Sequence, residues 1–393
     1  MKKKYVVLGL LFTFLASILL SGCGGGTGSA SKETYKIAYI GPITGANAAF
    51  GLGLRNSVEL AVKQANEKGD LPFKLEFVAL DDAGDPATAV NAANKAASDP
   101  KVIATVAHFN SGCALATKDV FHKYGLPSVI VAAINDKITQ DGYQEITRVI
   151  TASKVQNLYA GDVATKELGV KKIAVIQDQT DYGKTNAEQF IEQAKKNGAQ
   201  MLSFDGIAVG QQDFSALLTK IKAENPDMIF FGGLATEAAL IKRQMTENGI
   251  DAIFMSDSGI QSKTFIEIAG AAGEGTLCHG LVSPIEDLPK GKEFTTAYDK
   301  AGFKEYYEAY GPFAYDAANI IIQAMKNVKT IDRASVTKAI RETKNYDGVI
   351  GKTSFDKDGQ TTLNTVITYV VKDGKWVTLK NSGYTFKDGK MQK

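Results

Sequence analysis

Two matching series of short apolar segments and longer amphipathic segments constrain the fold of this chain more than any other feature. The first series predicts strands at 35–40, 73–80, 102–107 and 128–132, alternating with helices at 54–68, 86–98 and 111–123. The second predicts strands at 172–177, 201–204 and 228–232, alternating with helices at 183–197, 213–224 and 235–248. Strands that alternate with helices form parallel sheets covered on both faces. The sequence therefore predicts an α/β protein with two doubly wound parallel-sheet lobes.

The two series also match in their letters. Residues 36–40 read KIAYI and residues 172–176 read KIAVI, and each strand is followed by an aromatic-Gly pair, Phe50-Gly51 and Tyr182-Gly183. Internal repetition of this kind indicates two copies of one structural unit. Ligands of open α/β sheets bind beyond the carboxyl ends of the strands. We therefore expect a bipartite site in the cleft between the lobes.

Loops that follow the predicted strands contain the candidate binding residues. Ser111 opens a helix, so its hydroxyl and the N–H groups of Gly112 and Cys113 are placed to receive an anion such as a carboxylate. Ser111 would serve equally well as an ordinary helix cap. Phe50 and Tyr182 are expected at loop tips on facing lobes, either as lids over a ligand or as ordinary surface aromatics. Small residues after the strand at 128–132 allow a ligand to approach the backbone of Ala132, Ala133 and Ile134.

The N-terminus has the pattern of an export signal. Lysines at positions 2–4 precede a largely apolar run at 5–20, which is shorter than a membrane span. The run ends in Leu20-Ser21-Gly22-Cys23, which resembles a bacterial lipobox, although an ordinary signal peptide followed by a cysteine has a similar pattern. The Gly-rich and Ser-rich tract that follows is typical of a tether. We expect residues 1–22 to be a signal peptide, Cys23 to be lipidated, and residues 23–34 to link a lipid anchor to an exported body.

Composition and motif searches exclude several classes of function. Lys and Arg total 45 against 43 Asp and Glu, so the net charge of +2 gives no electrostatic support to a nucleic-acid partner. Three Cys and three His are too few for a disulfide framework or a multi-Cys zinc site. No base accompanies Cys113 at a meaningful spacing, and no dinucleotide or phosphate-binding motif is complete. We expect no catalysis, no metal and no cofactor.

An ordered set of short motifs resembles the branched-chain amino-acid-binding proteins of ABC importers. The motifs are DDAGDP at 81–86, NSG at 110–112, DYG at 181–183, FGG at 231–233, AYDAAN at 314–319, and the spaced set Gly351, Phe355, Asp356 and Gly359. The resemblance covers residues 35–393. It implies a type I periplasmic-binding fold, in which two lobes joined by three crossovers close on an amino acid and deliver it to a membrane permease.

The resemblance also implies how the chain is divided and with what it interacts. Crossovers near Thr151, Ser283 and Leu363 would assign 35–151 and 283–362 to lobe 1, and 152–282 and 363–393 to lobe 2. The implied protein is a monomer whose partners are an apolar, branched-chain amino acid and an ABC permease in the cytoplasmic membrane. Two alternatives stay open: a sensory ligand-binding protein of the same fold, and an importer receptor for a branched or aromatic carboxylate without an amine.

Some of the binding positions of the family match this chain. Its carboxylate-binding serine, second-loop backbone contact and aromatic lids are matched by Ser111 (between Asn110 and Gly112), by Ala132, and by Phe50 and Tyr182.

Other family positions differ in this chain. The family's second-loop hydroxyl is replaced by Ile134, its second-lobe aromatic by Leu234, and its ammonium-binding acid by Ser258, with Asp257 beside it. A desolvated ammonium without a counter-charge is costly, so either Asp257 takes that role or the ligand has no amine. The family's first-lobe disulfide is also absent, because Gly84 and Asn110 occupy its positions. Cys113 and Cys278 are therefore expected to be unpaired.

Overall fold

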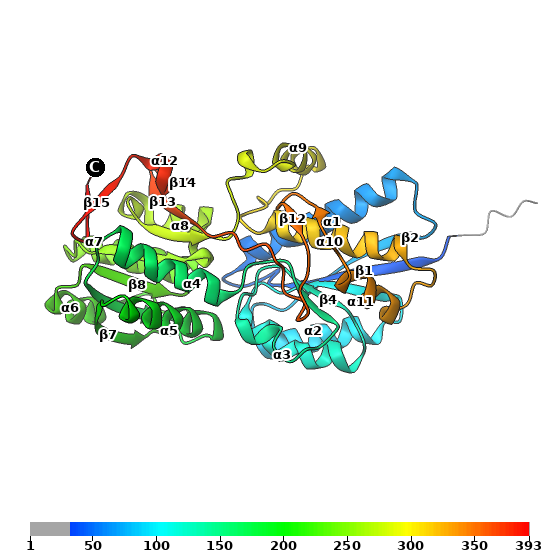
Figure 1. The fold of residues 1–393 in the computed structure, drawn as a ribbon, viewed down its shortest axis with the longest axis horizontal. Coiled ribbons are helices and arrows are strands. Elements are labelled where there is room, and N and C mark those ends of the chain that lie inside the picture. Colours follow the sequence, from blue (N-terminus) through cyan, green and yellow to red (C-terminus); the bar gives the residue numbers. More distant parts are fainter. Residues whose placement is uncertain (1–31, 393) are drawn as a thin grey trace, which may run out of the picture. The chain divides into compact units, whose positions relative to one another are not determined.

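A computed structural model describes residues 32–392 of the chain. The predicted signal peptide, the lipidation of Cys23 and most of the tether lie outside the described residues. From Thr34 onward the chain forms one compact unit, which contains two α/β lobes (Figure 1).

The first lobe contains a parallel sheet with the strand order β2-β1-β3-β4-β5. These strands are β1 Thr34–Gly41, β2 Lys74–Asp81, β3 Val102–Ala107, β4 Ser128–Ile130 and β5 Ile146–Arg148. Side chains alternate along β1, so that Ile37 and Tyr39 enter one hydrophobic cluster while Ala38 and Ile40 enter another. Both faces of this sheet are therefore buried.

Helices from distant parts of the sequence cover these two faces. One face packs against α1 Ala48–Lys68, α10 Gly311–Asn327 and α11 Arg333–Arg341, and the other against α2 Pro86–Ser98 and α3 Ser111–Lys123. Helix α9, Gly291–Ala301, lies against α1. Helix α2 begins at Pro86, where the missing N–H is not needed, and Asp85 caps it by accepting the N–H of Thr88 at 2.8 Å.

The second lobe contains a mixed sheet with the strand order β14-β13-β10-β9-β8-β6-β7. Its parallel strands are β6 Lys172–Gln177, β7 Gln200–Gly206, β8 Met228–Gly232, β9 Ile253–Asp257 and β10 Leu277–Gly280. Strands β13 Ile367–Lys372 and β14 Lys375–Thr378 complete it in antiparallel orientation. The helices are α4 Ser153–Asp162, α5 Asp181–Lys196, α6 Ser215–Glu224, α7 Ala235–Glu247, α8 Lys263–Ala269 and α12 Leu379–Ser382. Short antiparallel pairs are formed by β11 Tyr346–Asp347 with β12 Lys352–Thr353, and by β15 Thr385–Lys387 with β16 Lys390–Gln392.

The two C-terminal family motifs have structural roles in the first lobe. The buried carboxyl of Asp316 on α10 accepts the N–H groups of Val349 and Ile350, both at 2.9 Å. Burial raises the pKa of Asp316 to about 7. The backbone at Gly359 has a φ of +80°, which favours glycine, and its carbonyl accepts the N–H of Arg148 at 2.8 Å. Asp316 therefore ties α10 to the segment that follows β11, whereas Gly359 joins the late part of the first lobe to Arg148 at the end of β5.

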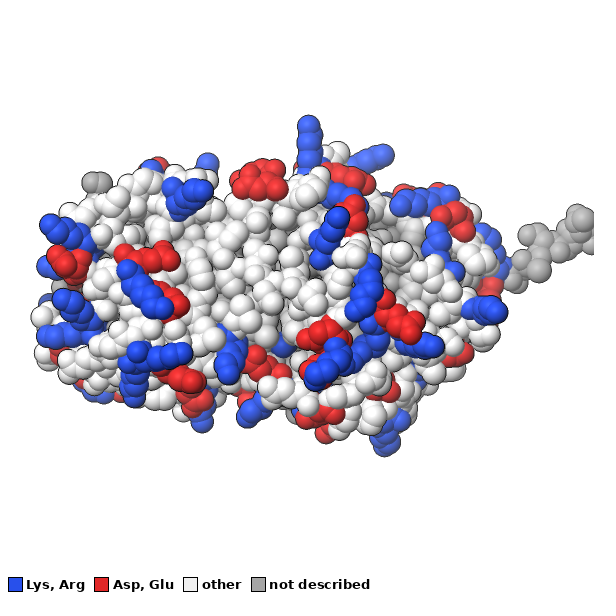
Figure 2. Space-filling view, in the orientation of Figure 1, with Lys and Arg blue, Asp and Glu red and all other residues white. Residues whose placement is uncertain are grey.

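The surface of the folded part has mixed charge. On the face drawn in Figure 2, basic and acidic side chains are interspersed rather than gathered by sign. Among the described residues, no helix combines the length and the apolar character needed to cross a membrane.

Candidate functional site

A cavity of about 220 Å³ lies between the lobes, at the carboxyl ends of their parallel strands. The first lobe contributes residues that follow β2, β3 and β4 together with one residue before α10: Gly84, Pro86, Phe109, Asn110, Ser111, Gly112, Ala132 and Tyr310. The second lobe contributes residues that follow β6, β8 and β9: Gln179, Thr180, Asp181, Tyr182, Leu234 and Gly259. The site is bipartite, as the repeated sequence pattern predicts.

The N-terminus of α3 forms the polar wall on the first lobe. Asn110 is the N-cap residue, but its side chain makes no capping hydrogen bond. Its Oδ1 is buried without a hydrogen-bond partner among the described residues. Ser111 follows as the first helical residue, fully buried, and its Oγ accepts the N–H of Asn135 at 3.3 Å. Ser111 therefore does not cap its own helix, and no side chain in the described part of the chain accepts the first N–H groups of α3.

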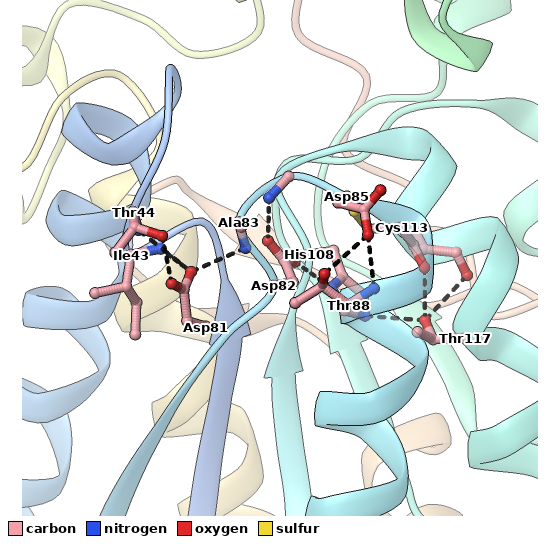
Figure 3. Close-up of polar contacts among 12 residues, drawn as sticks. Ile43, Thr44, Asp81, Asp82, Ala83, Asp85, Thr88, His108, Cys113 and Thr117 are labelled. Carbon is pink, nitrogen blue, oxygen red and sulfur yellow. Dashed lines mark hydrogen bonds and ion pairs between the residues drawn. The ribbon is translucent and has the colours of Figure 1, made fainter.

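The two loops that carry this wall are joined by a buried polar network, shown in Figure 3. Asp82 Oδ2 lies 2.8 Å from His108 Nδ1, and His108 Nε2 lies 2.9 Å from Thr117 Oγ1. Asp82 Oδ1 also accepts the N–H of Gly84 at 2.9 Å. A Cβ added to Gly84 would lie 3.2 Å from Asn110 Oδ1, so the two positions of the family's disulfide are adjacent in this fold. The loops are held together by hydrogen bonds instead.

The loop after β4 is positioned by a buried arginine. Arg148 is 1% exposed, and its Nη1 donates to the carbonyl of Asn135 at 2.7 Å while its Nε donates to Gln360 Oε1 at 2.5 Å. Burial lowers the pKa of Arg148 to about 10. In this loop Ala132 lines the cavity, whereas Ala133 and Ile134 are buried in the core away from it. The structure therefore assigns no cavity-lining role to Ala133 or Ile134.

Tyr182 forms the aromatic wall on the second lobe. It lies in the first turn of α5, lines the cavity, and accepts the N–H of Gly259 at its hydroxyl oxygen at 3.0 Å. This hydrogen bond fixes the ring against the second lobe. Leu234 and Gly259 complete the apolar part of the wall on that side, and Phe109 and Tyr310 face it from the first lobe.

Phe50 does not occupy the loop tip that the sequence pattern predicts. It lies within α1, is 3% exposed, and stacks on Phe109 with ring centroids 4.7 Å apart. The neighbouring glycines suggest a turn, but they permit close packing instead. A Cβ on Gly51 would lie 1.7 Å from the carbonyl oxygen of Pro42, and one on Gly53 would lie 2.6 Å from that of Tyr306. Phe50 therefore supports the cavity from behind, through Phe109, and is not a lid.

Asp257 and Ser258 lie behind the cavity wall. Asp257 is 0% exposed, and neither of its carboxyl oxygens has a hydrogen-bond partner among the described residues. Burial raises the pKa of this carboxyl well above its ordinary value. Ser258 is 2% exposed, with its Oγ 3.4 Å from Gln156 Oε1. Neither residue lines the cavity, although Gly259, the next residue along the chain, does.

Cys113 and Cys278 are free and buried, in agreement with the prediction that they are unpaired. Burial raises the pKa of both thiols, which disfavours the nucleophilic thiolate.

Several cavity residues were not predicted from the sequence. They are Gly84, Pro86, Phe109, Gln179, Thr180, Asp181, Gly259 and Tyr310. Phe109, Asp181 and Gly259 directly adjoin a predicted residue, and Gly84, Pro86, Gln179 and Thr180 lie within a few residues after a strand end, so a wider window around each strand end would include them. Tyr310 has no such signal, because it reaches the cavity from the start of α10.

Larger hollows lie elsewhere on the chain. One of about 880 Å³ runs between α10 and α11, within the first lobe alone. Another of about 710 Å³ adjoins α8, β14 and the segment before α10. Among the described residues, the first hollow contains no loop that follows a parallel strand, and the second contains such residues only from farther along the loops after β9 and β10, such as Gln261 and Val282.

Comparison with known proteins agrees with this geometry. The sequence model of the periplasmic binding protein family matches residues 34–375. A Leu/Ile/Val-binding protein homolog of Brucella suis is 33% identical over 334 residues, covering 85% of this chain and 89% of the relative. A leucine-binding protein from Thermotoga maritima shares 30% identity and superposes with a TM-score of 0.80, covering 88% of this chain and 97% of that one.

A branched-chain amino acid transporter substrate-binding protein from Streptococcus pneumoniae, solved with isoleucine, also superposes with a TM-score of 0.80. It shares 25% identity, covering 88% of this chain and 100% of that one. These likenesses extend over both lobes and over the loops that line the cavity. The chain therefore belongs to the periplasmic binding protein family, among the branched-chain amino-acid-binding proteins of the type I fold.

Proposed function

We propose that this chain is the extracytoplasmic solute-binding component of an ABC importer. It takes up an apolar amino acid, most simply a branched-chain one, in the cavity between its lobes and delivers it to a membrane permease. The observation that carries this proposal is the start of α3 at the cavity wall, where no side chain of residues 32–392 accepts the N–H groups of the first turn. Side chains cap the N-termini of α2, α5, α8 and α11, whereas α1, α4, α6, α7, α9 and α10 also lack a side-chain cap within the described chain. What singles out α3 is that its start lies at the cavity wall with the hydroxyl of Ser111 beside it.

A ligand carboxylate satisfies this helix end. The N–H groups of the first turn and the dipole of α3 attract negative charge, and the hydroxyl of Ser111 lies beside them. The rest of the ligand then lies among Phe109, Tyr182, Leu234 and Tyr310, which favour an apolar side chain. Because these groups belong to both lobes, the complete site exists only when the lobes are closed, and hinge closure is the state that a permease would recognise.

Three further assignments belong to the same proposal. Cys23 anchors the exported protein by lipid, and the protein acts as a monomer. The lobes divide at the crossovers near Thr151, Ser283 and Leu363. The order of the sheets supports this division, since β1 to β5 lie in one sheet and β6 to β10 with β13 and β14 in the other.

A second ligand class is favoured by one observation. Ser258 stands where the family has its ammonium-binding acid, and the neighbouring Asp257 is buried behind the wall rather than exposed in it. A branched or aromatic carboxylate without an amine would need neither residue. The two ligand classes therefore differ in whether an amine is recognised.

Thermal unfolding of residues 24–393 tests the proposal. Leucine, isoleucine, valine, phenylalanine and their deaminated acids are each added in large excess. A ligand at about one hundred times its Kd adds roughly 2.7 kcal/mol of stability, which is visible as a raised Tm. Stabilisation by the amino acids alone supports the main proposal. Stabilisation by the deaminated acids as strongly or more strongly supports the second class, and stabilisation by neither group contradicts both.

A further inference from the structure

The cavity wall carries a single charged side chain among its described residues. Of the described residues that line it, Asp181 is the one with an acidic side chain, and no lysine or arginine is among them. A ligand carboxylate at α3 is thus received by dipoles and N–H groups, without a compensating positive side chain. The sign of the fixed charge in the wall is negative.

Asp181 faces the proposed carboxylate position. It is the first residue of α5 on the second lobe, and its Oδ2 lies 3.2 Å from the point that a Cβ on Gly112 would occupy. Gly112 directly follows Ser111 at the start of α3. The carboxylate of Asp181 therefore approaches the same helix end as the ligand, from the opposite lobe.

The position of Asp181 is fixed by contacts between the lobes. Asn135 Nδ2 donates to the carbonyl of Asp181 at 3.3 Å and to Thr185 Oγ1 at 3.0 Å. The side chain of Asp181 is exposed, and within the described residues no hydrogen bond or ion pair to its carboxylate is found. Its charge is therefore available to a ligand in the closed cavity.

We infer that Asp181 acts as a charge filter, which favours a zwitterionic amino acid over the same acid without its amine. In an α-amino acid a single carbon separates the ammonium from the carboxylate, so a ligand held at α3 brings its ammonium into the field of Asp181. An acid without an amine brings only a second negative charge to that place, and like charges repel. This inference rests on the proposed function and names the residue that reads the amine.

Asp257 is the competing candidate for that role. Its carboxyl is fully buried and does not line the cavity, so its ionisation would require a desolvated charge behind Gly259. A charge on Asp181 carries no such desolvation cost, because its side chain is exposed to water.

The test compares leucine with 4-methylpentanoate, which is leucine without its amine, by titration calorimetry on the exported protein after dialysis. The measured quantity is the ratio of the two dissociation constants. We expect Asp181→Asn to reduce the preference for leucine by up to about fivefold, because an exposed charge pair contributes at most about 1 kcal/mol. Asp181→Glu, which keeps the charge, should retain most of the preference. Added salt should weaken the preference in the wild type more than in Asp181→Asn.

Glu188→Gln is the matched control, because it removes one negative charge from an exposed position on the same helix. It should leave the ratio unchanged, and the Tm of each variant without ligand reports any loss of folding. If the wild type prefers leucine but Asp181→Asn leaves the ratio unchanged, or if only Asp257→Asn changes it, the filter is wrong while the proposed function stands. If neither ligand binds the wild type, the proposed function is wrong, and the inferred role of Asp181 is wrong as well.

Discussion

Replacement of His108 by phenylalanine tests how strongly the buried network holds the two binding loops together. His108 lies between Asp82 and Thr117, with contacts of 2.8 and 2.9 Å, as Figure 3 shows. Its ring already lies 6.0 Å from that of Phe121. A phenylalanine ring therefore fits the buried position of the imidazole, and the substitution removes the hydrogen bonds of His108 with little change in side-chain volume.

The magnitude follows from burial. Asp82 and His108 are both 0% exposed, and removal of one hydrogen-bond partner leaves a buried polar group unsatisfied, which costs about 1–3 kcal/mol, and more where a charged group is involved. We expect His108→Phe to lower the free energy of unfolding by about 3 kcal/mol. Leucine binding should weaken as well, since the loops that follow Asp82 and His108 both line the cavity. The double variant Asp82→Ala/His108→Phe should cost about 2 kcal/mol less than the sum of the single variants.

Urea unfolding followed by far-UV circular dichroism measures these free energies. Calorimetry with leucine measures the affinity on the same samples. Additivity of the two single variants within about 0.5 kcal/mol would refute the coupling. Loss of stability with unchanged affinity would show that the network stabilises the lobe without positioning the loops.

Three further predictions concern other buried or interlobe groups. Burial raises the pKa of Glu308 to about 7 from an ordinary 4.5, so the folded chain retains a proton that the unfolded chain loses, and stability falls as pH rises between these values. Between pH 4.5 and 7, the free energy of unfolding of the wild type should fall by at most about 3 kcal/mol more than that of Glu308→Gln, as measured by urea unfolding. If the two free energies change with pH in parallel, the raised pKa of Glu308 is wrong. Arg148→Met should lower the free energy of unfolding by about 3 kcal/mol, because the carbonyl of Asn135 and the side chain of Gln360 lose a buried donor. Arg148→Lys should be equally destabilised, because an ammonium cannot donate to both acceptors as the guanidinium does. A wild-type urea midpoint for Arg148→Lys would contradict this explanation. Asn135→Ala should weaken leucine binding about tenfold by removing its hydrogen bonds to α5, chiefly through faster dissociation, and an unchanged dissociation rate would show that these bonds do not hold the closed state.

Much of the fold can be predicted from sequence because both sheets are covered on both faces. Such strands read as short apolar runs, and the predicted bounds agree with α2, β3, α3, β6 and β8 as the structure has them. These elements are also flanked by residues that favour the ends of helices and strands, such as Pro86 in the first turn of α2. The predicted helix at 54–68 begins later than α1, which starts at Ala48, because Gly51 and Gly53 suggest a loop although they serve tight helix packing.

The cavity could be predicted only in part. Ser111, Ala132, Tyr182 and Leu234 follow strand ends, so topology alone brings them to the cleft. Local sequence could not show whether a neighbour faces the cleft or the core, as the buried Ile134 demonstrates. Local sequence also does not predict that Tyr310 lines the cavity, because its position depends on how the distant helix α10 packs.

The packing of α1 against α10 has a consequence for biosynthesis. Buried residues line one side of α1, and α10 covers them although it begins only at residue 311. A nascent chain that has emerged as far as the second lobe therefore still lacks the helix that covers part of the apolar side of α1, although β1 and β2 are already present. Contacts so distant in sequence delay completion of a lobe during folding. Truncation before α10 should consequently convert α1 into a site for chaperones and proteases, even with the whole chain through α9 already made.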